Sequence, residues 1–202
     1  MNTKIFLASD KYVDFTTDII QAKAAQLFRG IIDDTQKARI AFAFVRDEIS
    51  HSFDINAKII TAKASDVLLH QTGICHAKAN LLAALLRSAG VPTGFCFQHI
   101  TLMDDDSQGY CAHAYNAVWL HERWIKVDAR GNKSGVNAQF SLDNPVLAFP
   151  CRVKYNEFFW PGIYAKPHAE TMAMLELANS LDDIIKHIPD KIALAPDAQE
   201  HA

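Results

Sequence analysis

The sequence predicts an α+β fold in which a buried central helix packs on an antiparallel β-sheet. Three patterns lead to this prediction: helical spacing of apolar residues near the N-terminus, a run of helix formers at residues 77–86, and strand-like alternation between residues 94 and 127. The chain has 202 residues, of which 50% are hydrophobic, so it is long enough for one domain with its own core. We therefore expect a single domain over residues 1–202.

The composition narrows the classes of partner and location. The formal net charge of -3 gives no basic field for nucleic acid and no attraction to an anionic membrane surface. The N-terminal apolar run, residues 5–8, is far shorter than a signal-peptide core, and no stretch approaches the ~20 residues of a membrane span. We expect a cytoplasmic protein whose four cysteines are thiols.

Two amphipathic helices are predicted in the N-terminal part, about residues 14–49. Apolar residues at helical spacing fill residues 14–29, and Gly30 supplies a C-terminal stop. The second helix, residues 34–49, begins at Asp34, which can cap it. We expect both helices to contribute to the core and to carry no chemistry.

The central helix has the clearest boundaries. A short helical turn at residues 67–69 ends before Gly73, and alanine and leucine then dominate residues 77–86. Gly90 and Pro92 end this helix. Because it is apolar almost all round, we expect it to be buried.

After Pro92 the period of the pattern changes to that of strands. Three strands are predicted at residues 94–102, 110–120 and 124–127, and they form a β-meander with a polar connection near residues 104–109.

The remaining segments are assigned in the same way. Residues 146–149 and 152–155 are also strand-like, and residues 169–187 are predicted to form one helix that Pro189 ends. We expect the tail after Pro196 to fray.

Cys75 stands at the start of the central helix. Gly73 permits a sharp turn before it, which places the sulfur in the first turn, where unpaired N–H groups and the helix dipole favour a thiolate. The same N–H groups can hold an oxyanion. The alternative is that Cys75 is only a small buried hydrophobic residue.

Two downstream residues complete a chemical proposal. His113 shares one face of its predicted strand with Cys111 and Tyr115, and Asp128 ends the neighbouring strand, where a carboxylate can reach an imidazole beside it. A structural histidine and a turn aspartate are the ordinary interpretations of each alone. Together with Cys75, however, they make the nucleophile, base and orienting carboxylate of thiol-based acyl transfer.

Several segments resemble the transglutaminase-like, papain-like cysteine superfamily, and in particular its small bacterial members. Residues 73–75, which open the alanine- and leucine-rich helix, are similar to the segment that carries its nucleophile. Residues 113–120 and 123–132 are similar to the segments that carry its histidine and aspartate. The resemblance covers about residues 35–190.

This resemblance implies a papain-like core at about residues 65–160, in which the nucleophile's helix packs on an antiparallel sheet. It implies that Cys75 is the nucleophile, His113 the general base and Asp128 the residue that orients the base, and it implies no cofactor. Many relatives carry an acidic residue or arginine just after the cysteine, whereas this chain has His76. That position therefore does not indicate the substrate.

Two glutamines are candidates for a further oxyanion donor. Gln71 resembles the glutamine that papain-like enzymes place ahead of their cysteine, although the spacing is shorter here. Gln98, on the first predicted strand, is the other candidate. An exposed or strand-bonded glutamine is the ordinary alternative for each.

The reaction we expect is hydrolysis or deamidation of an amide in a peptide or small-molecule substrate, through an acyl-enzyme. Protein cross-linking by the same intermediate is the first alternative. A second is a metal site formed by soft ligands at the helix–strand junction: Cys75, His76, Cys111 and His113. A third is a catalytically inert binding module of the same fold. The aspartates at residues 104–106 lack the spacing of a calcium loop.

Overall fold

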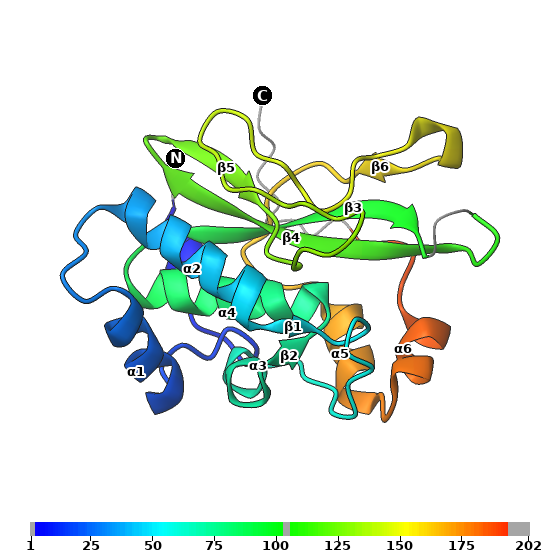
Figure 1. Cartoon of the computed structure of the whole chain (residues 1–202), viewed down its shortest axis with the longest axis horizontal. Coiled ribbons are helices and arrows are strands. Elements are labelled where there is room, and N and C mark those ends of the chain that lie inside the picture. Colours follow the sequence, from blue (N-terminus) through cyan, green and yellow to red (C-terminus); the bar gives the residue numbers. More distant parts are fainter. Residues whose placement is uncertain (1–2, 103–105, 194–202) are drawn as a thin grey trace.

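A four-stranded antiparallel sheet and the helix α4 (Cys75–Ser88) form the centre of the structure, a computed structural model that describes residues 3–102 and 106–193 (Figure 1). The strand order is β5-β4-β3-β6. The strands themselves are β3 (Thr93–Thr101), β4 (Tyr110–Leu120), β5 (Arg123–Val127) and β6 (Phe158–Phe159). The α+β prediction is therefore confirmed, and the meander lies within a residue or two of its predicted positions.

Helix α4 is buried on all sides, as its composition predicts. Every residue from Cys75 to Arg87 is buried, including four polar side chains that bond to backbone carbonyls. Asn80 donates to Ala62 O at 2.8 Å, and Arg87 donates to the carbonyls of Thr93 and Ala165 at 2.6 and 2.7 Å. Satisfying these buried groups removes most of the penalty of placing them in the core.

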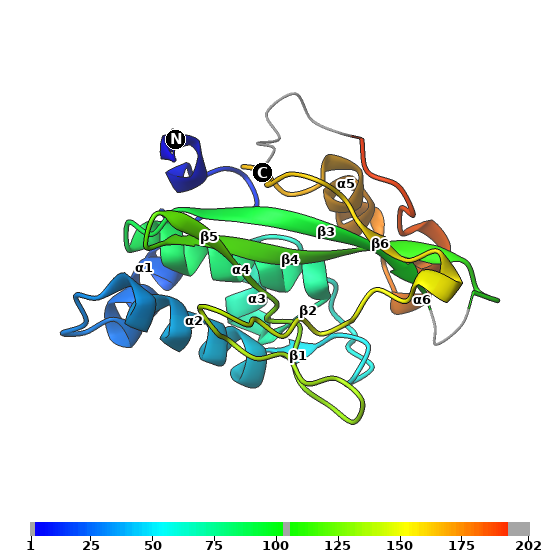
Figure 2. The ribbon, with the colours of Figure 1, turned by 90° about the horizontal axis from the view of Figure 1, so that it is seen from above.

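The N-terminal helices pack on the same side of the sheet as α4. They are α1 (Asp18–Leu27), α2 (Asp34–Glu48) and α3 (Ala64–His70), and Figures 1 and 2 both show them grouped around α4. Helix α1 starts later than predicted because the Asp14 carboxylate accepts hydrogen bonds from Ser65 and so joins this segment to α3. No helix among the described residues is long and apolar enough to cross a membrane.

Three predictions for the second half of the chain are wrong. Residues 146–149 form no strand beyond an isolated bridge between Gln139 and Val146. Residues 152–155 instead contain the 3-10 helix η2 (Val153–Tyr155), because the backbone and guanidinium of Arg152 both bond to Glu157.

The predicted C-terminal helix is two helices, α5 (Ala169–Leu177) and α6 (Leu181–His187). Ser180 begins α6 by accepting from Asp183 N at 3.1 Å, while the Asp183 carboxylate accepts from Asn179 N at 3.0 Å. This reciprocal cap stops the first helix and starts the second. The aspartates 104 and 105 and the tail after Pro196 lie outside the described residues.

A pair of two-residue strands leads into α4. Strand β1 (Ser50–His51) runs parallel to β2 (Thr72–Gly73), with His51 aligned to Gly73. Ser52 N donates to Gly73 O at 3.2 Å. This pairing fixes the chain immediately before Cys75.

Candidate active site

Cys75 is the first residue of α4, and its thiol interacts with His113 on strand β4. The N–H groups in the first turn of a helix have no carbonyl partner within the helix. The preceding residue, Ile74, has extended backbone and offers no side chain that could accept from them. Gly73 is closely packed, since a Cβ there would lie 3.1 Å from Ala77 Cβ and 3.2 Å from Thr61 Oγ1, and these neighbours would have to move to admit a side chain. Cys75 is thus held by the core and is only 9% exposed.

His113 and Asp128 meet in the interior, as the sequence predicts. His113 Nε2 donates to Asp128 Oδ2 at 2.8 Å, and the two residues are 2% and 1% exposed. The pairing of Asn116 with Val127 places Asp128 just beyond the end of β5, beside β4. The Phe149 ring meets the His113 ring edge to face, with the ring centres 5.1 Å apart.

The Asp128 carboxylate is held by two further donors. Arg130 N donates to Oδ1 at 3.1 Å, and Ala148 N donates to Oδ2 at 3.0 Å. The N–H of Ala148 therefore bonds to this carboxylate and not to a neighbouring strand, which explains why residues 146–149 do not form the predicted strand. A carboxylate with three donors stays in one orientation, and it holds the His113 ring with it.

The electrostatics favour a charge-separated pair between thiol and imidazole. Burial alone disfavours the thiolate, but the charge and hydrogen bond of His113 and a backbone hydrogen bond from Ala114 lower the pKa of Cys75 below its ordinary value. Burial likewise disfavours imidazolium, yet the charges of Asp128 and Cys75 raise the pKa of His113. The arrangement therefore stabilises thiolate and imidazolium together.

The other three cysteines lack such partners. Burial raises the pKa of Cys96 and of Cys111 to about 12 in each case. Burial also raises the pKa of Cys151 above its ordinary value. Cys75 is consequently the one cysteine of the four whose surroundings favour the nucleophilic form.

The two glutamines are placed differently from the triad. Gln98 pairs with His113 across β3 and β4 and is buried, but its amide donates to Phe149 O at 2.9 Å and to Cys151 Sγ at 3.4 Å. Gln71 is exposed at the end of α3, in left-handed backbone with φ 53°. Among the described hydrogen bonds, none joins either amide to Cys75, and their role as oxyanion donors stays a prediction.

The proposed alternative ligand set does not assemble. His76 turns away from Cys75 and donates from Nε2 to Ala112 O at 2.7 Å, while burial lowers its pKa to about 3. Over residues 3–102 and 106–193, no group of three or more histidine, cysteine or acidic side chains is placed to hold a metal ion.

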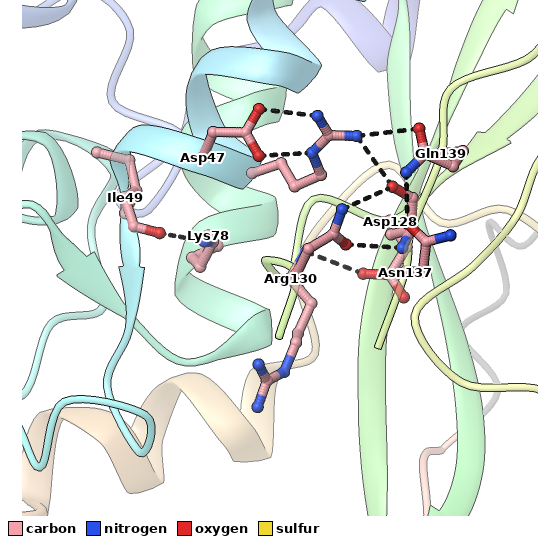
Figure 3. Close-up of polar contacts among 10 residues, drawn as sticks. Asp47, Ile49, Lys78, Asp128, Arg130, Asn137 and Gln139 are labelled. Atoms are coloured by element: carbon pink, nitrogen blue, oxygen red, sulfur yellow. Dashed lines mark hydrogen bonds and ion pairs between the residues drawn. The ribbon is translucent and has the colours of Figure 1, made fainter. Parts of the chain in front are cut away.

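A polar network secures the loop after Asp128 and was not predicted. Figure 3 shows Lys78 bonded to Ile49 O and the Arg130 backbone bonded to Asp128, with the Arg130 side chain extending away from Asp47. That side chain pairs in bidentate fashion with Asp54. A lysine within an otherwise apolar helix was a visible signal that Lys78 has a buried partner.

Further residues beside the triad come from β1. His51 is buried near His113 and Arg130, and one of its ring nitrogens has no hydrogen-bond partner. Its position depends on the short pairing of β1 with β2, and no local pattern in the sequence announces a two-residue strand.

Comparisons with known proteins bear on the fold and the family. A search of curated proteins finds no match to this chain. Among solved structures, a Cytophaga hutchinsonii protein described as a candidate cysteine protease is similar, with a TM-score of 0.52 and 20% identity over 64% of this chain and 42% of the other. The periplasmic domain of TgpA from Pseudomonas aeruginosa is matched with a TM-score of 0.48 and 17% identity, over 64% and 48%.

This chain thus spans less than half the length of either solved protein. At 20% identity, the likeness to the Cytophaga hutchinsonii protein shows the fold alone. The family is shown by a separate finding, because the family model of the transglutaminase-like superfamily matches residues 21–129, more than half of the chain. That match includes Cys75, His113 and Asp128, and the chain belongs to the transglutaminase-like superfamily.

Proposed function

We propose that the protein is a cysteine hydrolase that cleaves an amide bond in a peptide or small-molecule substrate through an acyl-enzyme on Cys75. The observation that supports this most is the buried, hydrogen-bonded pair of His113 and Asp128 beside a thiol whose pKa is lowered. Perturbed ionisable groups with matched partners are typical of catalytic sites.

The proposed reaction follows from the roles of the three side chains. The thiolate of Cys75 attacks the amide carbon, an S–C bond forms, and the carbonyl π pair moves to oxygen. When that pair returns, the C–N bond breaks and the leaving amine takes the proton of His113. Water then attacks the thioester with His113 as base, which releases the carboxylic acid and restores the thiol.

Asp128 determines which nitrogen of His113 takes part. Its carboxylate occupies Nε2, so Nδ1 is the nitrogen left for the Cys75 thiol and the leaving group. The negative charge of Asp128 stabilises the imidazolium that forms when the thiolate is generated. Its role is electrostatic and orientational, and it need not take the proton.

Hydrolysis is favoured over amine transfer by access to the sulfur. Cys75 is 9% exposed, and small molecules such as water reach a nearly buried thioester more readily than the side chain of a protein lysine. The acceptor is open to a direct test. With glycine ethyl ester present, hydrolysis predicts free acid as the main product, whereas a stable amide product would favour cross-linking.

Intact-protein mass spectrometry tests the proposed nucleophile. After incubation with an activated ester, the wild type is expected to carry one acyl group that disappears as water resolves it. Cys75→Ala should carry none, and the control Cys151→Ala should behave as the wild type because Cys151 lies outside the triad. Equal acylation of Cys75→Ala would contradict the proposal.

A further inference from the structure

His51 lies in the strand that pairs with the segment before Cys75, and no hydrogen bond to its ring nitrogens is present among the described residues. Strand β1 places it alongside Gly73, two residues before Cys75, and its electrostatic neighbours include the catalytic base His113.

The ring of His51 is buried yet makes no hydrogen bond among the described residues. The residue is 9% exposed, and Nδ1 is sealed from solvent without a partner, whereas Nε2 is not sealed. The ring stacks on Phe53, with the ring centres 5.9 Å apart. A buried polar group without a partner is destabilising, so such a group calls for an explanation.

The surroundings of His51 select its neutral form and one tautomer. Burial lowers its pKa well below the ordinary value, and the positive charges of Arg130 and Lys78 act in the same direction, against an opposing contribution from Asp54. A buried N–H group without an acceptor is rarer in proteins than a buried acceptor without a donor, and Nδ1 has no partner. We therefore assign the proton of the neutral ring to Nε2, the nitrogen that is not sealed.

We propose that His51 donates a hydrogen bond from Nε2 to the acyl oxygen of the substrate and so completes the oxyanion hole with the first-turn N–H groups of α4. The inference rests on the proposed function and adds a residue to it. The two glutamine amides do not fill this role in the structure, since one bonds to Phe149 and Cys151 and the other is at the surface.

The donor acts in one defined step. As the S–C bond forms, the carbonyl π pair becomes a negative charge on oxygen, and the Nε2–H bond of His51 meets that charge without giving up its proton. When the charge returns to form the C=O bond and the amine leaves, the hydrogen bond weakens again. A neutral donor serves here because it stabilises the charge that develops and adds no positive charge beside His113.

Ion pairs of Asp54 hold the segment that follows His51 in place. Asp54, three residues further on, accepts from Arg130 and also from Lys133 Nζ at 2.9 Å. Arg130 in turn bonds to Asp128 through its backbone. One chain of contacts therefore connects the donor, its loop and the orienting carboxylate, which is the preorganisation that an oxyanion hole requires.

Two reagents that react with the Cys75 thiol distinguish an oxyanion role of His51 from a general effect on thiol reactivity. Iodoacetamide alkylates Cys75 by displacement and forms no oxyanion, whereas p-nitrophenyl acetate acylates it through a tetrahedral oxyanion. His51→Phe keeps the ring and removes the donor, His51→Gln restores a donor, and His70→Phe makes the same change at an exposed position on α3.

The expected result is a loss confined to acylation. His51→Phe should slow acylation by about 100-fold, the usual effect of removing one oxyanion donor, and leave alkylation within about twofold of wild type. His51→Gln should recover part of the acylation rate, and His70→Phe should match the wild type. Thermal unfolding of each variant confirms that the fold is retained.

The results that would contradict the role of His51 differ from those that would contradict the proposed function. Equal slowing of both reactions, or no slowing of acylation in His51→Phe and His51→Gln, overturns the role of His51 while the acyl-enzyme mechanism stands. Absence of any adduct on Cys75 of the wild type overturns the proposed function and this inference with it.

Discussion

Replacing Asp128 by asparagine tests the electrostatic core of the site. The change keeps the side-chain shape but removes the charge that lies 2.8 Å from His113 Nε2. Two unit charges at this distance attract by ~6 kcal/mol at an effective dielectric constant of 20. Desolvation offsets part of that attraction, and breaking one buried pair typically amounts to about 3–5 kcal/mol.

The lower end of this range, about 3 kcal/mol, gives the expected decrease in the thiolate population. At 1.36 kcal/mol for each factor of ten, a loss of about 3 kcal/mol reduces the thiolate–imidazolium population by about 100-fold near neutral pH. Asp128→Asn should therefore alkylate with iodoacetamide about 100-fold more slowly at pH 7, with the difference shrinking as the pH is raised. The wild-type rate should level off at a lower pH than that of an ordinary thiol, because the pKa of Cys75 is lowered.

The assay is the pH profile of alkylation, followed by intact mass. Asp143→Asn is a matched control, because Asp143 pairs with Arg123 at the surface and far from the thiol in the sequence. If Asp128→Asn and wild type gave the same profile, Asp128 would not stabilise the imidazolium and the argument for the triad would be refuted.

Two further predictions concern stability. Asp54→Ala leaves Arg130 buried without its carboxylate, so the free energy of unfolding in urea should fall by about 3 kcal/mol, whereas Asp143→Ala should change it by less than ~1 kcal/mol; similar losses would contradict the burial argument. Burial lowers the pKa of His76 from 6.5 to about 3 in the fold. The unfolded chain therefore binds the proton at a higher pH than the folded chain, and stability falls as the pH drops below 6.5. Between pH 6.5 and 5 the wild type should lose about 2 kcal/mol more than His76→Gln, which can still donate to Ala112 O, because other buried histidines such as His51 titrate in both proteins; parallel curves would show that His76 is not a titrating group.

The parts of the fold that the sequence predicts correctly are those with long periodic patterns. Helix α4 and strand β4 begin and end where composition and period change, so local propensity and burial agree there. The break between α5 and α6 also had a local signal, since Ser180 and Asp183 have the spacing of a reciprocal cap, but the apolar pattern on either side obscured it.

Other features depend on partners far away in the chain. Residues 146–149 have a strand-like composition, yet the N–H of Ala148 bonds to Asp128 instead of a neighbouring strand. The strands β1 and β2 contain two residues each, too few for any period to be visible. The contact between His113 and Asp128 could be predicted from residue types and strand positions, while the unpartnered ring of His51 could be found only from the structure.

The burial of α4 has a consequence for how the proposed activity can diversify. Cys75 is fixed by a helix that the core surrounds, so its sulfur cannot shift without disturbing the whole domain. In the connections that follow β1 and β5, residues 55–59 and 141–147 are exposed or half-buried and make none of the hydrogen bonds that hold the His113–Asp128 pair. New substrate preferences can therefore be built by exchanging these two segments, in nature or by loop grafting, while Asp54, Arg130 and Ala148 stay in place.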